Sequence, residues 1–201
     1  MAAIVVPFRG TGGKRRLRGL SDEWRARLVL AMLADVVAAT TAVSRTVVVT
    51  SDQRGAAVAE EAGAEIVADP GGGQGAAVAA ALGLLPTDSV VIVNADVPCV
   101  TPYDLRSLVA ATPPGGIALV ASADGRTNAL SLPAPHLFQP RYGPRSAERF
   151  RSAATELGLE TVAVAIPNLA DDVDTADDLE RVAHRAGPRT RAVLAEEGAR
   201  A

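Results

Sequence analysis

The sequence predicts an α/β fold in which a mostly parallel sheet carries helices on both faces. Short runs rich in β-branched residues alternate with helical stretches along the chain, and this alternation is typical of strand–helix–strand units. The run 89–94 holds four successive aliphatic residues, as expected for a strand that is covered on both faces. At 201 residues, the chain has the length of one domain with a sizeable core.

The first half of the chain is expected to alternate regularly between strands and helices. Ser21 can cap the first helix, because Asp22 and Glu23 follow it where carboxylates suit the helix dipole. Apolar residues then recur every four positions from Trp24 to Val36, as one helix face requires. The other expected elements are strands at 3–7, 46–50 and 65–67 and helices at 54–61 and 76–85.

The second half begins with the central strand at 89–94. Thr101 followed by Pro102 opens a helix, with threonine as the cap and proline at the first helical position. Ser146 is expected to cap a later helix, and Thr175 to start the last one. The strands expected here are 117–121, 128–132 and 161–166. We expect one domain over 1–186, followed by a charged, alanine-rich tail over 187–201 that can form a loosely attached helix.

Composition excludes several classes of function. The net charge of −3 gives no basic field for nucleic acid, and no apolar stretch is long enough to span a membrane. The start lacks a signal peptide, so a cytoplasmic location is expected. Cys99 is the single cysteine, and His136 and His184 are the only histidines. We interpret these three residues as packing or surface residues, so any metal should be a hard cation held by carboxylates.

The loop after the first strand is the first candidate site. Gly12 and Gly13 free the backbone to turn N–H groups toward an anion, and Arg9 adds positive charge. The loop lacks the Walker A pattern and the Rossmann dinucleotide pattern, yet it can hold a triphosphate. Lys14 is the one lysine among 20 basic residues, which suggests a place where a compact ammonium is needed. A solvated basic loop is the alternative interpretation.

Carboxylates follow the central strand and precede the last helix. Asp96 stands just past the strand, where a metal carrying phosphates can bind. Asp172 and Asp174 alternate, so in an extended segment they face the same way, and such like charges repel unless a cation lies between them. Alternatively, Asp174 or Thr175 simply caps the last helix.

A second anion-binding region is expected before the helix that starts near Ser146. Glycine, serine and free N–H groups at a helix start favour a phosphate or carboxylate, and Arg145 and Arg149 lie beside them in the sequence.

Together these elements resemble the family of 2-phospholactate and phosphoenolpyruvate guanylyltransferases that make the activated intermediate for coenzyme F420. The most specific motifs are Thr127-Asn128-Ala129-Leu130, then Tyr142-Gly143 with Ser146, and Asp172-Val173-Asp174-Thr175. Lys14-Arg15-Arg16-Leu17 is similar to the family's first loop, and Asp96-Val97-Pro98 to its Asp-Leu-Pro.

The resemblance implies a single-domain, Rossmann-like nucleotidyltransferase fold and the transfer of GMP from GTP. Mg²⁺ would be bound by Asp96, Asp172 and Asp174, and Lys14 would meet the triphosphate, so Lys14 and Asp96 are the expected catalytic residues. The nucleotide would contact Pro7, Arg9, Gly12, Gly13, Lys14, Gly73 and Gln74. The three-carbon acid would contact Thr127, Gly143 and Ser146.

Two positions depart from the family pattern: Gln74-Gly75 replaces Leu-Asn, and Arg126 replaces a small residue. We expect phosphoenolpyruvate as the acceptor, because the arginine bias suggests a GC-rich bacterium and bacterial members are associated with that acid. The alternatives are 2-phospho-L-lactate, a molybdopterin or sugar-phosphate acceptor, and a non-catalytic nucleotide-binding regulator. The sequence leaves the oligomeric state open, a homodimer included.

Overall fold

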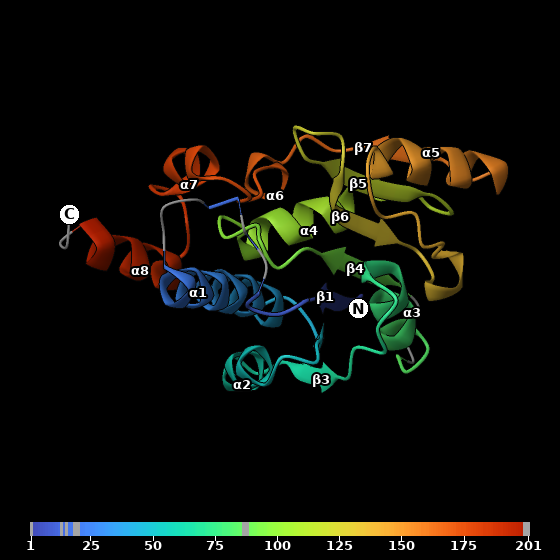
Figure 1. Cartoon of the computed structure of the whole chain (residues 1–201). Coiled ribbons are helices and arrows are strands. Elements are labelled where there is room, and N and C mark those ends of the chain that lie inside the picture. The colour runs from blue at the N-terminus through green and yellow to red at the C-terminus, as the bar shows by residue number, and fades with distance from the viewer. Residues whose placement is uncertain (1, 13, 15, 18–20, 86–88, 199–201) are drawn as a thin grey trace.

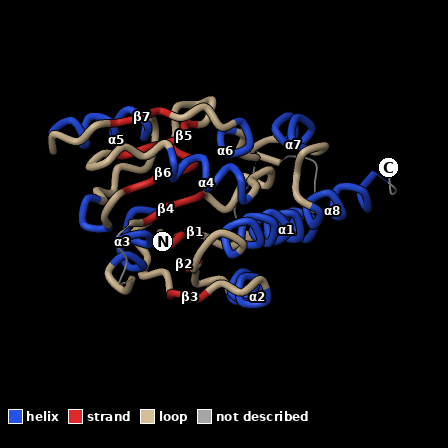
Figure 2. Tube along the Cα trace, turned by 180° about the vertical axis from the view of Figure 1, so that it is seen from behind, coloured by secondary structure: helices blue, strands red, loops and turns tan. Residues whose placement is uncertain are grey.

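The computed structural model describes residues 2–12, 14, 16–17, 21–85 and 89–198. Within these residues, one sheet of seven strands runs in the order β3-β2-β1-β4-β6-β5-β7, which Figure 2 shows as a stack of strands from β3 to β7. The strands are β1 (Ala3–Pro7), β2 (Thr46–Val49), β3 (Glu65–Val67), β4 (Val90–Val93), β5 (Ile117–Ala121), β6 (Thr127–Leu132) and β7 (Thr161–Ala163).

Helices connect most of these strands (Figure 1). They are α1 (Asp22–Thr41), α2 (Gln53–Glu61), α3 (Gln74–Leu82), α4 (Pro102–Ala110), α5 (Ser146–Glu156), α6 (Pro167–Ala170), α7 (Ala176–Val182) and α8 (Pro188–Gly198). The short α6 and a single 3₁₀ turn at Pro135–Leu137 lie where no element was predicted. The last strand was predicted to reach residue 166 but ends at Ala163.

The predicted α/β fold with a mostly parallel sheet is confirmed. Strands β3, β2, β1 and β4 pair in parallel, and β5 pairs with β7 in parallel. β6 is the exception, because it runs antiparallel to both of its neighbours, β4 and β5. Its insertion between them lets Asn128, near the start of β6, lie beside Asn94, which follows the end of β4: the Asn94 N–H donates to the Asn128 carbonyl at 2.9 Å.

Helices cover both faces of the sheet, as predicted. Alternate strand residues point to opposite faces, so Val91 and Val93 join one core cluster while Val90 and Ile92 join the other. The first cluster includes residues of α1, α2, α4, α6 and α7, and the second includes residues of α3 and α5. Figure 1 shows α3 and α5 together on one side of the molecule and α1 and α2 on the other.

Three helices begin at the cap residues that the sequence predicts. The hydroxyl of Ser21 accepts from the Trp24 N–H, and Thr101 and Thr175 form complete capping boxes. The prediction that Ser146 caps α5 is wrong: the cap is Arg145, with φ of 52°, and Ser146 is the first helical residue. The Ser146 hydroxyl is turned toward β6 instead, where it hydrogen-bonds to Thr127.

Helix α8 lies within the segment that we expected as a charged tail, and it packs along α1 (Figure 1). The buried carboxylate of Asp35 on α1 accepts hydrogen bonds from the N–H groups of Arg189 at 3.1 Å and Thr190 at 2.8 Å. These donors stand at the start of α8, where helical N–H groups lack intrahelical partners. Among the described residues, no helix is both long and apolar enough to cross a membrane.

Candidate functional site

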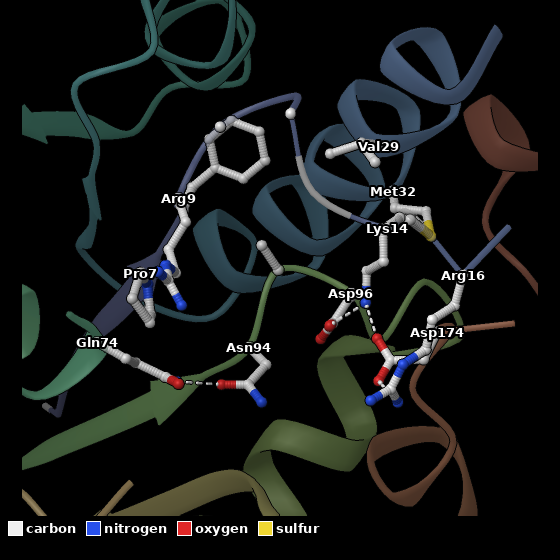
Figure 3. Close-up of a pocket in the computed structure, with 14 residues that line it drawn as sticks. Pro7, Arg9, Lys14, Arg16, Val29, Met32, Gln74, Asn94, Asp96 and Asp174 are labelled. Atoms are coloured by element: carbon white, nitrogen blue, oxygen red, sulfur yellow. Dashed lines mark hydrogen bonds and ion pairs between the residues drawn. The ribbon is translucent and has the colours of Figure 1, made fainter. Parts of the chain in front are cut away.

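A cavity of about 640 Å³ opens at the carboxyl ends of β1 and β4 (Figure 3). In parallel α/β sheets this edge is where ligands bind. The first loop forms one wall, α1 contributes Val29 and Met32, and the end of β4 contributes Asn94 to Asp96. The full lining is Pro7, Phe8, Arg9, Gly10, Gly12, Lys14, Arg16, Val29, Met32, Gln74, Asn94, Ala95, Asp96 and Asp174.

Lys14 joins two of the predicted carboxylates. Its Nζ lies 2.5 Å from Asp96 Oδ2 and 2.6 Å from Asp174 Oδ1, and Figure 3 shows the ammonium between them. Burial disfavours the charged ammonium, but the attraction and hydrogen bonds of the two aspartates outweigh it and raise the pKa of Lys14. The lysine therefore stays protonated and neutralises part of a strongly acidic site.

Asp172 completes the acidic cluster. Carboxylate oxygens of Asp96, Asp172 and Asp174 all lie within 4.8 Å of one another. Burial, and then the charge of Asp96, raises the pKa of Asp172. Asp96 Oδ1 is buried and has no hydrogen-bond partner within the described part of the chain. Three carboxylates, one of which has an oxygen without a partner, fit a divalent cation such as Mg²⁺.

The first loop is tied to α2 by Asp52. The Asp52 carboxylate caps α2 through the Gly55 N–H at 2.8 Å and also accepts from the N–H of Thr11 at 2.9 Å and from its hydroxyl at 3.1 Å. Burial opposes the charge of Asp52, but these hydrogen bonds together lower its pKa. Phe8 packs so closely on Gly55 that a Cβ there would lie 2.3 Å from the ring. Phe8 and Thr11 thus anchor the loop on both sides of Gly10.

The three residues expected to hold the acid lie outside the lining of this cavity. Thr127 and Ser146 are 2% and 1% exposed, and they are bonded to each other. The Thr127 N–H donates to Ser146 Oγ at 2.9 Å, and the Ser146 hydroxyl lies 3.1 Å from Thr127 Oγ1. Gly143 has φ of 118° and accepts from the Ser146 N–H at 3.1 Å. Their role as acceptor ligands stays a prediction.

The structure brings most of the other expected site residues together. Pro7, Arg9, Gly12 and Gln74 line the cavity with Lys14, Asp96 and Asp174. Gly73 directly precedes Gln74 and is the N-cap of α3, with φ of 92°. Gly13 lies outside the described residues.

Several residues of the site escaped the sequence-based prediction. Asp52 follows a strand and carries no motif of its own, and Asn94 and Asn128 bond each other only because β6 lies beside β4. Two arginines approach Asp174 Oδ2: Arg16 Nη1 at 3.9 Å and Arg126 Nη1 at 3.8 Å. The sequence offered two signals: Asn94 follows a central strand, and Asn128 belongs to the 127–130 motif that Arg126 precedes.

Comparison with known proteins gives a family match over nearly the whole chain. The family model described as "Guanylyl transferase CofC like" matches residues 2–198. A phosphoenolpyruvate guanylyltransferase of Nocardia farcinica is 36% identical, covering 98% of this chain and 91% of that protein. A 3-phospho-D-glycerate guanylyltransferase of Phenylobacterium zucineum is 34% identical, covering 98% and 96%.

Solved structures share the fold at low sequence identity. A candidate nucleotide-diphospho-sugar transferase from Desulfovibrio desulfuricans superimposes with a TM-score of 0.81 at 17% identity, covering 99% of this chain and 96% of that one. A 4-diphosphocytidyl-2C-methyl-D-erythritol synthase gives a TM-score of 0.61 at 16% identity, with 96% and 97% coverage. The architecture is therefore that of the nucleotidyltransferases.

Proposed function

The chain belongs to the family of CofC-like guanylyl transferases, and on that premise we propose that it transfers GMP from GTP to phosphoenolpyruvate in the biosynthesis of coenzyme F420. The products would be enolpyruvyl-diphospho-guanosine and pyrophosphate. The observation that carries the proposal is the cavity in which Lys14, Asp96 and Asp174 meet beside the glycine-containing first loop.

In the proposed reaction, a phosphate oxygen of the acid attacks the α-phosphorus of GTP. A new P–O bond forms as the bond between the α-phosphorus and the bridging oxygen breaks, and the electron pair leaves with pyrophosphate. An ionised phosphate is already a nucleophile, so the protein has mainly to position two anions and offset their repulsion. The absence of both histidines from the cavity lining fits this requirement.

The residues of the cavity supply these functions. Lys14 and Arg9 would face the triphosphate, and the first loop, held by Asp52 through Thr11, would present its backbone N–H groups. Gln74, at the start of α3, would contact the nucleoside. Asp96, Asp172 and Asp174 would hold Mg²⁺, which when bound supplies positive charge that offsets the charge developing on the phosphate oxygens.

Phosphoenolpyruvate is the proposed acceptor because several relatives at 33–37% identity carry that name. The relative from Phenylobacterium zucineum makes 3-phospho-D-glycerate the second candidate. Competition tests the choice: phosphoenolpyruvate, 2-phospho-L-lactate and 3-phospho-D-glycerate are supplied at equal concentration with GTP and Mg²⁺, and the products are weighed. We expect mainly the enolpyruvyl product. A dominant glyceryl or lactyl product would reject phosphoenolpyruvate, and no guanylylated product with any acid would reject the guanylyltransferase proposal itself.

The acid pocket is tested by Ser146→Ala. Because the Ser146 hydroxyl fixes both the N–H and the hydroxyl of Thr127, its loss should raise the KM for the acid by about 10-fold and leave the KM for GTP nearly unchanged. Steady-state kinetics with each substrate varied in turn measures both constants. Ser152→Ala, an exposed position on the same helix, is the matched control. An equal rise in both KM values would show that Ser146 serves another part of the site.

A further inference from the structure

Three amide side chains lie in a row beside the acidic cluster. Gln74 Nε2 donates to Asn94 Oδ1 at 2.6 Å, Asn94 Nδ2 donates to Asn128 Oδ1 at 3.2 Å, and Asn128 Nδ2 donates to Asp172 Oδ1 at 3.2 Å. Figure 3 shows the cavity end of the row, with Gln74 reaching Asn94. We infer that this amide row is a positioning device, in which Asn128, supported by Asn94, aims the Asp172 carboxylate at the cation.

Backbone carbonyls fix the direction of the row. Asn94 Nδ2 also lies 3.2 Å from the Thr127 carbonyl oxygen, and Asn128 Nδ2 lies 3.1 Å from the Ala170 carbonyl oxygen. A carbonyl oxygen can only accept a hydrogen bond. Flipping the side-chain amide of Asn94 or Asn128 would place its Oδ1 against a backbone carbonyl oxygen. The N–H groups of the row therefore all point toward Asp172.

Asp172 depends on a neutral donor, the Asn128 amide, for its orientation, unlike Asp96 and Asp174. Asp96 and Asp174 are held by the ammonium of Lys14, whereas among the described residues no cationic side chain lies within ion-pair distance of Asp172. An amide N–H fixes the direction of a carboxylate without cancelling its charge. Asn128 therefore leaves the full charge of Asp172 available to a cation.

Asn128 is placed to hold this geometry rigidly. It is 2% exposed and stands near the start of β6, between β4 and β5. Its Nδ2 bridges Asp172 and the last residue of α6, Ala170, so it ties the central sheet to the segment that carries Asp172 and Asp174. Partners of ligating carboxylates in other metal sites act in this way, and their loss weakens the metal by about 10- to 100-fold.

The inference rests on the proposed role of Asp172 as a cation ligand, and the test reads cation binding directly. Mn²⁺, a paramagnetic substitute for Mg²⁺, is titrated into the full chain with GTP and followed by electron paramagnetic resonance. Asn128→Ala should weaken Mn²⁺ binding by about 10- to 100-fold. Excess Mg²⁺ should partly restore the turnover of Asn128→Ala, because it refills the weakened cation site. The matched control is Ser131→Ala, which removes another buried hydrogen bond of β6, from Thr112, away from the cavity.

Asn94→Ala is the second variant, because Asn94 is only half-buried and we expect this variant to fold even if Asn128→Ala does not. It should weaken Mn²⁺ binding by a smaller factor of about 3- to 10-fold, since Asn128 then loses its support but keeps its bond to Asp172. Parental Mn²⁺ affinity in Asn94→Ala, or in folded Asn128→Ala, would overturn the inference. A parent chain that binds Mn²⁺ with GTP but guanylylates no acid would reject the proposed function and leave the positioning role standing.

Discussion

Replacing Asp96 by asparagine should reduce kcat on the order of 1000-fold while the chain stays folded. The substitution keeps the shape of the side chain but removes the charge of a carboxylate that bonds Lys14 and has a second, unpartnered oxygen. Removing a preorganised electrostatic contact at a reacting centre has effects of about this size, and a cation ligand contributes through the cation as well. The rate of product formation at limiting Mg²⁺ measures the loss of activity, and thermal unfolding shows whether the variant stays folded.

Asp174→Asn should behave in the same way, because Asp174 is bonded to the same ammonium and belongs to the same cluster. The matched control is Asp177→Asn, an exposed position in the first turn of α7 that lies outside the cluster. This control should keep activity close to that of the parent. Near-native turnover in both Asp96→Asn and Asp174→Asn at limiting Mg²⁺ would show that no shared cation site exists there.

Lys14→Arg should lower kcat/KM by about 100-fold although the charge is kept. The Lys14 side chain is 12% exposed and its single nitrogen meets two carboxylates at 2.5 and 2.6 Å. A guanidinium is a broad planar fork and cannot replace this compact contact. A displacement of about 1 Å in a catalytic group is enough to cost about 100-fold in rate.

The control for Lys14→Arg is the reverse exchange at a position outside the cavity lining, Arg54→Lys. Arg54 is exposed on α2, so its charge is largely screened by water. Its kcat/KM should stay within a few-fold of the parent value. If Lys14→Arg does the same, the one lysine of the chain is an accident of composition.

The sequence by itself determined the parts of the molecule whose causes are local. The alternation of apolar runs and helical patterns gave the α/β class, and the caps at Ser21, Thr101 and Thr175 stand as predicted. Each of these features depends on residues within one or two turns of the chain. Asp96 follows the end of β4, at the edge where parallel sheets bind ligands, whereas Asp174 follows α6, a helix that the sequence did not predict.

Only the tertiary structure decided how distant segments meet. The direction of β6 is antiparallel to β4 and β5, which no residue of the run 127–132 encodes by itself, because strand direction depends on the partners that a strand finds. The same placement created the amide row from Asn94 to Asp172. It also drew the Ser146 hydroxyl away from the helix cap toward Thr127, since a buried hydroxyl must bond whichever polar group the packing places within reach.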